Sequence, residues 1–249
     1  MIQTADRDGI RIITLNNPPV NALSFALSGE LLPVVEAAEH EDAIKAVIFT
    51  GANDLFSGGA DVNDFSTEPT PETKSIRDVI AAIERGKKTY VAAIDGTAMG
   101  GGLELSLVCD YRIATTRSKV GLPEIKLGLL PGAGGTQRLP RLIGAQAAME
   151  MMLKGETVKA EDAKKKGILD EVVESNVVDA AIALACRALE KEPKRRISAR
   201  QAQLGIPGLG LNALPFIAAQ AHKMVPKEDN GGFAAHKLVD AVEAAVELP

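Results

Sequence analysis

The sequence of 249 residues contains no tryptophan, two cysteines and three histidines, and only 3% of its residues are aromatic. Cys109 and Cys186 have no other cysteine or histidine near them in the sequence, so we predict buried thiols rather than a disulfide or a metal site. His40, His222 and His236 stand apart, without the spacing of zinc ligands or a serine elbow nearby. We therefore predict that they are surface residues and that the chain has no metal site.

Long apolar runs are also missing. No run approaches the roughly 20 apolar residues of a membrane helix, and the first residues lack a basic flank followed by a long apolar stretch. The formal net charge of −5 argues against a polyanionic partner, although a local basic cluster such as residues 194–196 remains. We predict a soluble cytoplasmic protein that binds neither nucleic acid nor membranes.

Alternating strand and helix patterns fill the first two thirds of the chain. β-Branched runs at residues 10–15 and 46–50 flank residues 24–39, whose apolar positions recur at helical spacing. The alternation continues with a helix at 72–85, a strand at 90–95, a helix at 101–109 and a strand at 111–114. Such a succession favours parallel strands with crossover helices, so we predict an α/β fold.

The last third is mostly helical by pattern. Three helices are predicted at residues 145–153, 159–166 and 177–189, and two more at 215–224 and 232–247. Glycine and proline punctuate the stretch between these two groups. We therefore predict a core over residues 1–190 and a helical C-terminal region over 191–249, which starts with a linker at about 193–212.

Three glycine-rich or turn-forming segments carry the chemically informative residues. The first, Ser57-Gly58-Gly59-Ala60-Asp61, suits a turn with outward-pointing N–H groups, and Asp61 can cap a helix that begins at Val62. A plain loop with a helix cap explains this segment equally well.

The second segment is Gly100-Gly101-Gly102-Leu103-Glu104. Its glycines precede a predicted helix, where free N–H groups and the helix dipole favour negative charge. Tight packing of helix on sheet is the alternative interpretation. It does not explain Glu104, a carboxylate in an otherwise apolar helix that needs solvent, a partner or an active-site cavity.

The third segment, Gly121-Leu122-Pro123-Glu124, places a glutamate in a turn. A surface carboxylate paired with Lys126 is one interpretation of Glu124. The other is that the fold brings Glu104 and Glu124 together for acid and base chemistry on one substrate. The glycine-rich residues 131–135 lack the Gly-Lys-Ser/Thr ending of a phosphate loop, and no Gly-x-Gly-x-x-Gly opens a helix after a strand. NAD is therefore not implied.

Taken in order, four segments resemble the crotonase (enoyl-CoA hydratase/isomerase) superfamily. They are residues 16–24 (Asn-Asn-Pro-Pro-Val-Asn-Ala-Leu-Ser), 57–61, 100–104, and 121–124 running into 130–139. The resemblance covers roughly residues 10–175. It implies a crotonase-type spiral of ββα units with a mostly helical C-terminal part, which binds acyl-CoA thioesters.

The resemblance also implies site residues and a reaction. The amides of Ala60 and Gly101 would form an oxyanion hole, and Glu104 and Glu124 would be the catalytic pair that holds one water between them. Further substrate contacts would come from Asp61, Val62, Asn63 and Gly132, with the Gly132 amide near the water, and residues 65–88 would line the acyl-tail pocket. The implied enzyme hydrates trans-2-enoyl-CoA to 3-hydroxyacyl-CoA in fatty-acid β-oxidation, with 3,2-enoyl-CoA isomerisation as a further activity. No cofactor is implied, since coenzyme A is part of the substrate.

Finer matches look like the hydratase portion of multifunctional β-oxidation enzymes. Asn63 stands where many free-standing hydratases have lysine, and the chain ends without their C-terminal tail. A homotrimer or hexamer, or a covalent continuation into a dehydrogenase, follows as an expectation. Two alternatives remain: an isomerase or other acyl-CoA lyase that uses one glutamate, and a non-enzymatic RNA-binding relative. The acidic composition disfavours the second.

Overall fold

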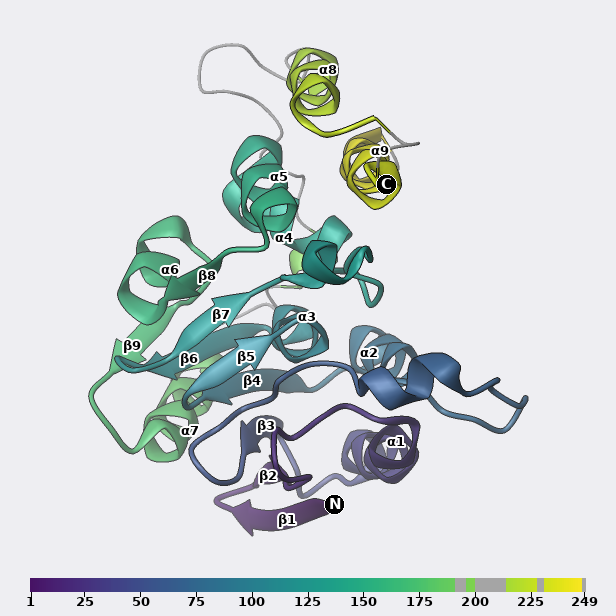
Figure 1. The fold of residues 1–249 in the computed structure, drawn as a ribbon. Helices are drawn as coiled ribbons and strands as arrows, with labels where there is room; N and C mark the ends of the chain where they lie inside the picture. Colours follow the sequence, from purple (N-terminus) through teal and green to yellow (C-terminus); the bar gives the residue numbers. More distant parts are fainter. Residues whose placement is uncertain (191–195, 200–213, 228–230, 248–249) are drawn as a thin grey trace.

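The computed structural model describes residues 1–190, 196–199, 214–227 and 231–247, which form two β-sheets and the helices that cover them (Figure 1). Most of the predicted linker at 193–212 lies outside the described residues. The boundary between residues 1–190 and 191–249 therefore stays a prediction.

Six strands form the larger sheet, and all neighbours pair in parallel except the first two. In order across the sheet they are β1 (Ile2–Arg7), β2 (Ile10–Leu15), β3 (Ala46–Gly51), β4 (Thr89–Ile94), β6 (Tyr111–Thr115) and β9 (Glu171–Val173). The antiparallel β1–β2 hairpin was not predicted. It closes through Asp8 and Gly9, whose φ angles of 54° and 74° suit a two-residue turn.

The central strands are buried on both faces, and their side chains alternate between two apolar clusters. On β3, Val47 and Phe49 join the cluster that contains the apolar stripe of α1 (Phe25–His40) and α2 (Ile76–Arg85). Ala46 and Ile48 join the cluster under α7 (Val177–Leu189). This arrangement explains why the predicted central strands read as continuous apolar runs. Ser24 caps α1 by accepting a hydrogen bond from Leu27 N at 3.1 Å.

The smaller sheet consists of β5 (Thr97–Met99), β7 (Lys119–Gly121) and β8 (Thr157–Lys159), in that order. β5 and β7 are parallel and pair Met99 with Gly121, so both strands end at the same edge of the sheet. Helix α3 (Gly101–Val108) begins after β5, and the short helix η2 (Glu124–Leu127) begins after β7. This edge therefore brings Glu104 and Glu124 into one region of the fold.

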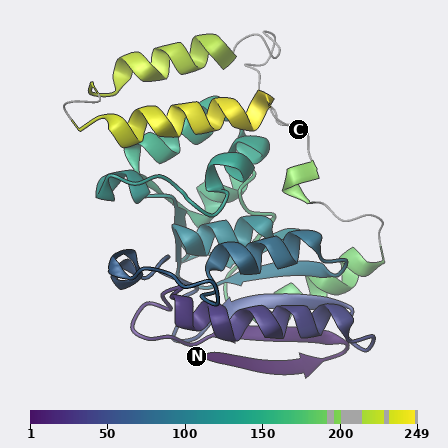
Figure 2. The same cartoon turned by 90° about the vertical axis from the view of Figure 1, so that its right-hand side faces the viewer.

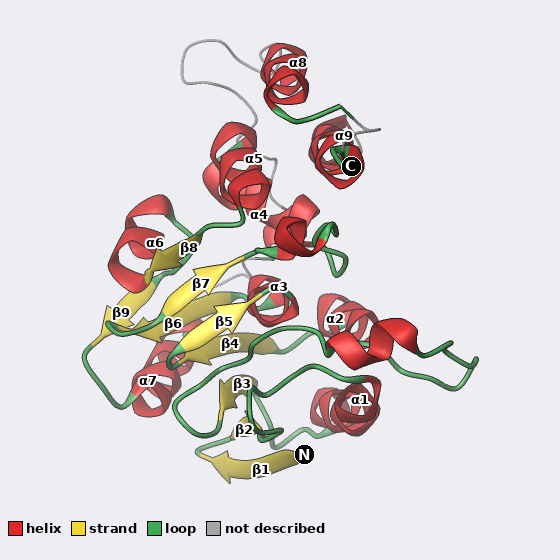
Figure 3. Cartoon of the chain, viewed as in Figure 1, coloured by secondary structure: helices red, strands yellow, loops and turns green. Residues whose placement is uncertain are grey.

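The other described helices surround the strands. They are η1 (Val62–Ser66), α4 (Gly135–Ile143), α5 (Ala145–Lys154), α6 (Ala160–Lys166), η3 (Ile197–Ala199), α8 (Leu214–Met224) and α9 (Phe233–Glu247). Figure 3 shows α4, α5, α8 and α9 together on one side of the strands. Figure 2 shows α8 and α9 side by side, and both pack on α5. The predicted α/β fold with a mostly helical C-terminal part is confirmed. None of the described helices is long and apolar enough to span a membrane.

The core joins α9 to the helices beneath it. Leu238, Val239 and Val242 of α9 are fully buried in the same cluster as the apolar residues of α4 and α5. Cys109 is buried as predicted, but Cys186 is exposed, because the buried stripe of α7 does not include its position.

Candidate active site

The glycine-rich loop that leads to Ala60 is held between two other segments by backbone hydrogen bonds. Ser57 O accepts from Met99 N at 3.0 Å, and Gly59 O accepts from Leu23 N at 2.8 Å. Gly59 has a φ of 109°, and a Cβ there would lie 2.9 Å from Met99 O. Only glycine permits this approach, which brings the Ala60 amide to the end of β5.

Gly101 presents a second amide beside Ala60. It is the first residue of α3, so its N–H has no acceptor within the helix. A Cβ on Gly101 would lie 3.5 Å from Ala60 N, and a Cβ on Gly59 would lie 3.6 Å from Gly101 N. The two predicted oxyanion-hole amides thus lie together at the positive end of the helix dipole. The alternative interpretation, close packing of the glycine-rich helix start, also applies, because a Cβ on Gly102 would lie 2.8 Å from Ser57 O.

Glu104 lies one turn into α3 and is only 3% exposed. Its Oε1 accepts hydrogen bonds from Ala133 N at 2.7 Å and Gly135 N at 2.8 Å. Burial raises the pKa of Glu104, while these two amides and the charges of Arg138 and Arg77 oppose the rise. The glycine-rich loop before α4 therefore does bind an anion, but the anion is a carboxylate of the protein itself.

Glu124 begins η2 at the end of β7, and its Oε1 approaches Gly100, where a Cβ would lie 3.3 Å from it. Its Oε2 is buried and has no hydrogen-bond partner within the described chain. Burial, and then the charge of Glu104, raises the pKa of Glu124 to about 7. The alternative of a solvated turn carboxylate paired with Lys126 is wrong, because no ion pair among the described residues joins the two and the free oxygen is buried.

The raised pKa of Glu124 predicts a pH dependence of stability. Between the ordinary value of 4.5 and about 7, the folded state binds this proton more tightly than the unfolded state. The free energy of unfolding must then fall as pH rises through this window, by at most about 3 kcal/mol at 1.36 kcal/mol per unit. We expect denaturant titrations at pH 5 and pH 8 to show a smaller fall for Glu124→Gln than for the wild type. Equal falls would contradict the raised pKa.

Arg138 on α4 supports the loop that holds Glu104, and this residue was not singled out from the sequence. Its Nη2 pairs with Glu84 Oε2 on α2 at 2.6 Å, and its Nη1 donates to Ala133 O at 3.2 Å. The side chain of Arg138 is only 13% exposed. Arg138 therefore links α2 to the loop whose amides bind Glu104.

A cavity of about 590 Å³ lies between α2 and α4 and reaches the same loop. Its wall includes Ile80, Ala81, Gly132 and Ala133, and also several arginines, among them Arg77. The cavity therefore adjoins the loop whose Ala133 amide donates to Glu104. Its α2 wall belongs to residues 65–88, which were predicted to line an acyl-tail pocket.

The other predicted substrate contacts lie at the surface. Asp61 caps η1 by accepting from Asn63 N at 3.0 Å, as the helix-cap interpretation predicted, and its Oδ1 also accepts from Asn63 Nδ2 at 2.9 Å. Val62 is 61% exposed. Gly132 is exposed in the loop before α4. These residues flank Ala60 and the Glu104 carboxylate rather than forming a buried set.

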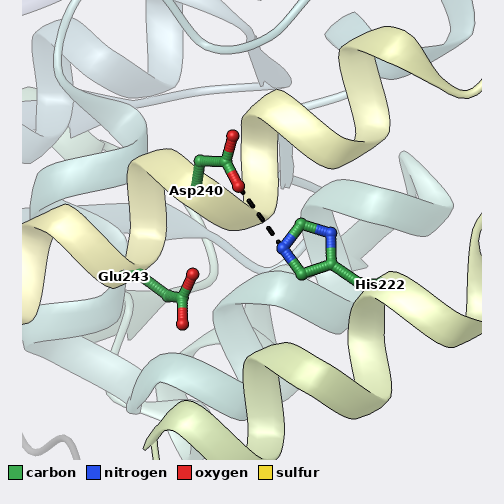
Figure 4. A group of neighbouring side chains, drawn as sticks. All are labelled: His222, Asp240 and Glu243. Atoms are coloured by element: carbon green, nitrogen blue, oxygen red, sulfur yellow. Dashed lines mark ion pairs between the residues drawn. The ribbon is translucent and has the colours of Figure 1, made fainter. Parts of the chain in front are cut away.

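The expectation that all three histidines stand apart is wrong for two of them. His222 Nδ1 and His236 Nδ1 lie 2.7 Å apart, because α8 and α9 pack against each other. His222 also lies beside Asp240 and Glu243, two acidic residues of α9 (Figure 4). This group is remote in sequence from every predicted active-site residue.

The α/β fold, with Glu104 and Glu124 near the Ala60 and Gly101 amides, agrees with the predicted crotonase type, and sequence comparison supports it. The chain belongs to the enoyl-CoA hydratase/isomerase family, whose family model matches residues 5–204.

Two kinds of curated relative are similar to this chain in sequence. The peroxisomal bifunctional enzyme of Pongo abelii is 41% identical over 97% of this chain, which covers 33% of that protein. A glyoxysomal fatty acid beta-oxidation multifunctional protein of Cucumis sativus is 44% identical over 67% of this chain and 24% of its own length. The chain thus spans about a third or less of these relatives. Their names agree with the predicted resemblance to multifunctional β-oxidation enzymes.

Solved structures share the fold along nearly the whole chain. The enoyl-CoA hydratase from Bacillus anthracis has a TM-score of 0.71 and 31% identity, and the match covers 97% of this chain and 90% of that one. The enoyl-CoA hydratase from Mycobacterium tuberculosis H37Rv has a TM-score of 0.66 and 29% identity, with coverage of 99% and 97%. The predicted crotonase-type fold is confirmed.

Proposed function

We propose that this chain is an enoyl-CoA hydratase that adds water across the double bond of a trans-2-enoyl-CoA. The observation that carries the proposal is the pair of glutamates, Glu104 buried and Glu124 half-buried, next to the amides of Ala60 and Gly101. Glu124 has a buried oxygen without a partner in the described chain, and its pKa is raised to about 7. A carboxyl group tuned to neutral pH suits proton transfer at a reacting carbon.

The Ala60 and Gly101 amides would receive the thioester oxygen. As water adds at the β-carbon, negative charge develops on this oxygen, and donors fixed in place stabilise the enolate-like transition state. Removing one donor from comparable oxyanion holes costs about 3 to 4 kcal/mol. The position of Gly101 at the start of α3 adds the favourable helix dipole.

The two glutamates would divide the proton transfers. Glu104 receives two N–H donors, which favour its ionised form, so it suits the base that takes a proton from water. Burial, and then the charge of Glu104, raise the pKa of Glu124, although its own backbone amide opposes the rise. Its Oε2 has no partner in the described chain, so Glu124 suits the acid that protonates the α-carbon. Water supplies OH to the β-carbon and a proton to Glu104. Transfer of that proton from Glu104 to Glu124 then restores the starting protonation state of both carboxyl groups.

The remaining predicted residues would bind the substrate. The amide of Gly132 would contact the water, and Asp61, Val62 and Asn63 would contact the coenzyme A portion. The acyl chain would enter the cavity between α2 and α4. This reaction needs no cofactor besides coenzyme A, which is part of the substrate.

The place of this reaction is fatty-acid β-oxidation, which two of the relatives' names support. The relatives are named as peroxisomal or glyoxysomal, so they lend no support to the predicted cytoplasmic location. Trimer or hexamer formation, and a continuation into a dehydrogenase, stay predictions.

Shifting a 3-enoyl double bond to the 2-position is a second activity of the same site. Its support is the family description, which names both hydratase and isomerase, and a glutamate pair able to remove and return a proton. An isomerase or lyase that uses one glutamate would tolerate loss of the other, and an RNA-binding relative would show salt-dependent RNA retention.

The direct test is the ultraviolet absorbance of the conjugated enoyl thioester after crotonyl-CoA is mixed with the protein. We expect the absorbance to fall as 3-hydroxybutyryl-CoA forms. If neither crotonyl-CoA nor a longer 2-enoyl-CoA is hydrated, the proposal is wrong.

Arg138→Met is expected to lower turnover through the Glu104 loop. The variant loses the pair with Glu84 and the hydrogen bond to Ala133 O, and a shift of about 1 Å at Glu104 can cost up to 100-fold. We expect kcat to fall while KM changes little, and the free energy of unfolding to fall by about 2 kcal/mol. Steady-state kinetics and urea unfolding check both. Arg138→Lys, which keeps the charge, should recover part of kcat, and an unchanged kcat in Arg138→Met would contradict a positioning role.

A further inference from the structure

A histidine of α8 and two carboxylates of α9 lie together away from the predicted active-site residues. We propose that His222, Asp240 and Glu243 bind a divalent transition-metal ion of the Zn²⁺ class. One nitrogen or oxygen atom from each of the three side chains lies within 4.8 Å of the others. Figure 4 shows the His222 ring projecting from α8 toward the two carboxylates of α9. This inference is independent of the proposed function, and it revises the prediction that the chain has no metal site.

The spacing is close to that of a metal site. Ligand atoms held at about 2.0 to 2.2 Å from one tetrahedral Zn²⁺ lie about 3.3 to 3.6 Å apart. The three atoms, which lie within 4.8 Å of one another, therefore need to close by at most about 1.5 Å. His222 and Asp240 have side chains 31% and 47% exposed, so both can rotate and an ion can reach them.

Hydrogen bonding outside the cluster relates the tautomer of a neutral His222 to that of His236. Pro226 O can only accept, so His236 Nε2, at 3.0 Å from it, must donate. In a neutral His236 ring, Nδ1 is then bare and accepts from His222 Nδ1, 2.7 Å away. The two rings are nearly parallel, at 13°, and their centroids lie 4.9 Å apart.

A neutral His222 that donates through Nδ1 has a bare Nε2. This nitrogen lies 3.3 Å from Asp240 Oδ1, so a lone pair faces a carboxylate with no hydrogen between them. Two electron-rich atoms at this distance repel each other unless a cation joins them. A metal ion between these two atoms would bind both His222 Nε2 and Asp240 Oδ1. The contact of His222 Nδ1 with His236 would orient the ring, as hydrogen-bond partners of metal-bound histidines do.

The charged side chains around His222 are compatible with a bound cation. Lys237 Nζ bonds Asp240 Oδ2 at 3.1 Å, so Oδ1 is the oxygen turned toward His222. Glu243 adds a second carboxylate from the same helix. One imidazole and two carboxylates form a mixed nitrogen and oxygen set, which suits Zn²⁺, Ni²⁺ or Co²⁺ better than the all-oxygen preference of Mg²⁺ or Ca²⁺. Three protein ligands leave a position for water.

Binding of such an ion would cross-link α8 to α9. Helix α9 also contacts α4, where Gln137 Nε2 donates to Ala241 O at 2.8 Å. The ion would therefore stabilise the helix pair that packs against α4 and α5, and thermal unfolding should shift upward with added metal.

The test is isothermal titration calorimetry of the full chain with ZnCl₂ in a buffer that does not chelate metal. We expect one saturable site, with a matching rise in the thermal unfolding midpoint that EDTA reverses. His222→Ala, Asp240→Asn and Glu243→Gln should each raise Kd at least tenfold. His236→Ala should raise Kd by about 10 to 100-fold, as loss of an orienting partner does.

Asp162→Asn is the matched control. Asp162 is an exposed helical aspartate paired with Lys165 at a spacing of three residues, as Asp240 is paired with Lys237. It should bind Zn²⁺ as the wild type does, and circular dichroism of each metal-free variant should show a folded chain. Absence of a saturable site, or equal Kd values in wild type, Asp240→Asn and Glu243→Gln, would overturn the proposal.

Discussion

Replacing Glu124 with glutamine should lower kcat for crotonyl-CoA hydration by about 100-fold to 10,000-fold, the range expected when a general acid or base is removed. Glutamine keeps the shape of the side chain but has no proton to transfer to the α-carbon. Glu104→Gln should cause a loss of the same order. It also replaces one carboxylate oxygen that accepts from the Ala133 and Gly135 amides. Initial rates at saturating crotonyl-CoA measure both effects.

Glu161→Gln provides a matched control, because Glu161 is an exposed glutamate on α6, away from the site. It should hydrate at the wild-type rate. Wild-type turnover by either active-site variant would show that only one glutamate acts and would favour the isomerase or lyase alternative. A comparable collapse in both supports the shared mechanism.

The second large effect is expected from Ala60→Pro, which removes one of the two amide donors. Proline has no N–H, and its ring would occupy the space that the thioester oxygen needs. The loss of one oxyanion donor is expected to lower kcat by about 10² to 10³-fold. Because Ala60 is exposed, little core packing is lost with its methyl group.

Ala60→Gly keeps the amide and should retain most of the activity, which separates the role of the N–H from that of the side chain. Thermal unfolding of both variants checks that each is folded. The role assigned to this amide is wrong if a folded Ala60→Pro protein turns over crotonyl-CoA as fast as Ala60→Gly does.

Local sequence patterns predicted the larger elements well, because the physical signals there are strong. Residues 46–50 form a continuous apolar run, and the strand Ala46–Gly51 is buried on both faces. Ser24 precedes an apolar helical pattern and caps α1. The ordered motifs also indicated the family and singled out Glu104 and Glu124, whose segments the structure shows to follow the neighbouring parallel strands β5 and β7.

Other features depend on contacts that no local pattern encodes. The three-residue strands β5, β7 and β8 are too short to show an alternating pattern. The contact between His222 and His236 depends on how α8 packs on α9. The hairpin at Asp8 and Gly9, in contrast, had a recognisable Asp-Gly turn signal that went unused.

The loop before α4 gave an incomplete signal as well. Its glycines raised the possibility of a phosphate loop, and the missing Gly-Lys-Ser/Thr ending argued against one. Glu104, the anion that it binds, is 29 residues from Ala133 in the sequence. The sequence could show that donors were available, but only the fold shows which acceptor they meet.

The two amides that donate to Glu104 also influence which enantiomer of the 3-hydroxyacyl product would form in the proposed hydration. A carboxylate oxygen has two lone pairs, and both on Oε1 are engaged by Ala133 and Gly135. A proton taken up by Glu104 must therefore sit on Oε2, so only one edge of this carboxylate can meet the attacking water. With the thioester oxygen fixed by Ala60 and Gly101, water would reach a single face of the planar double bond, and the 3-hydroxyacyl product would form as one enantiomer.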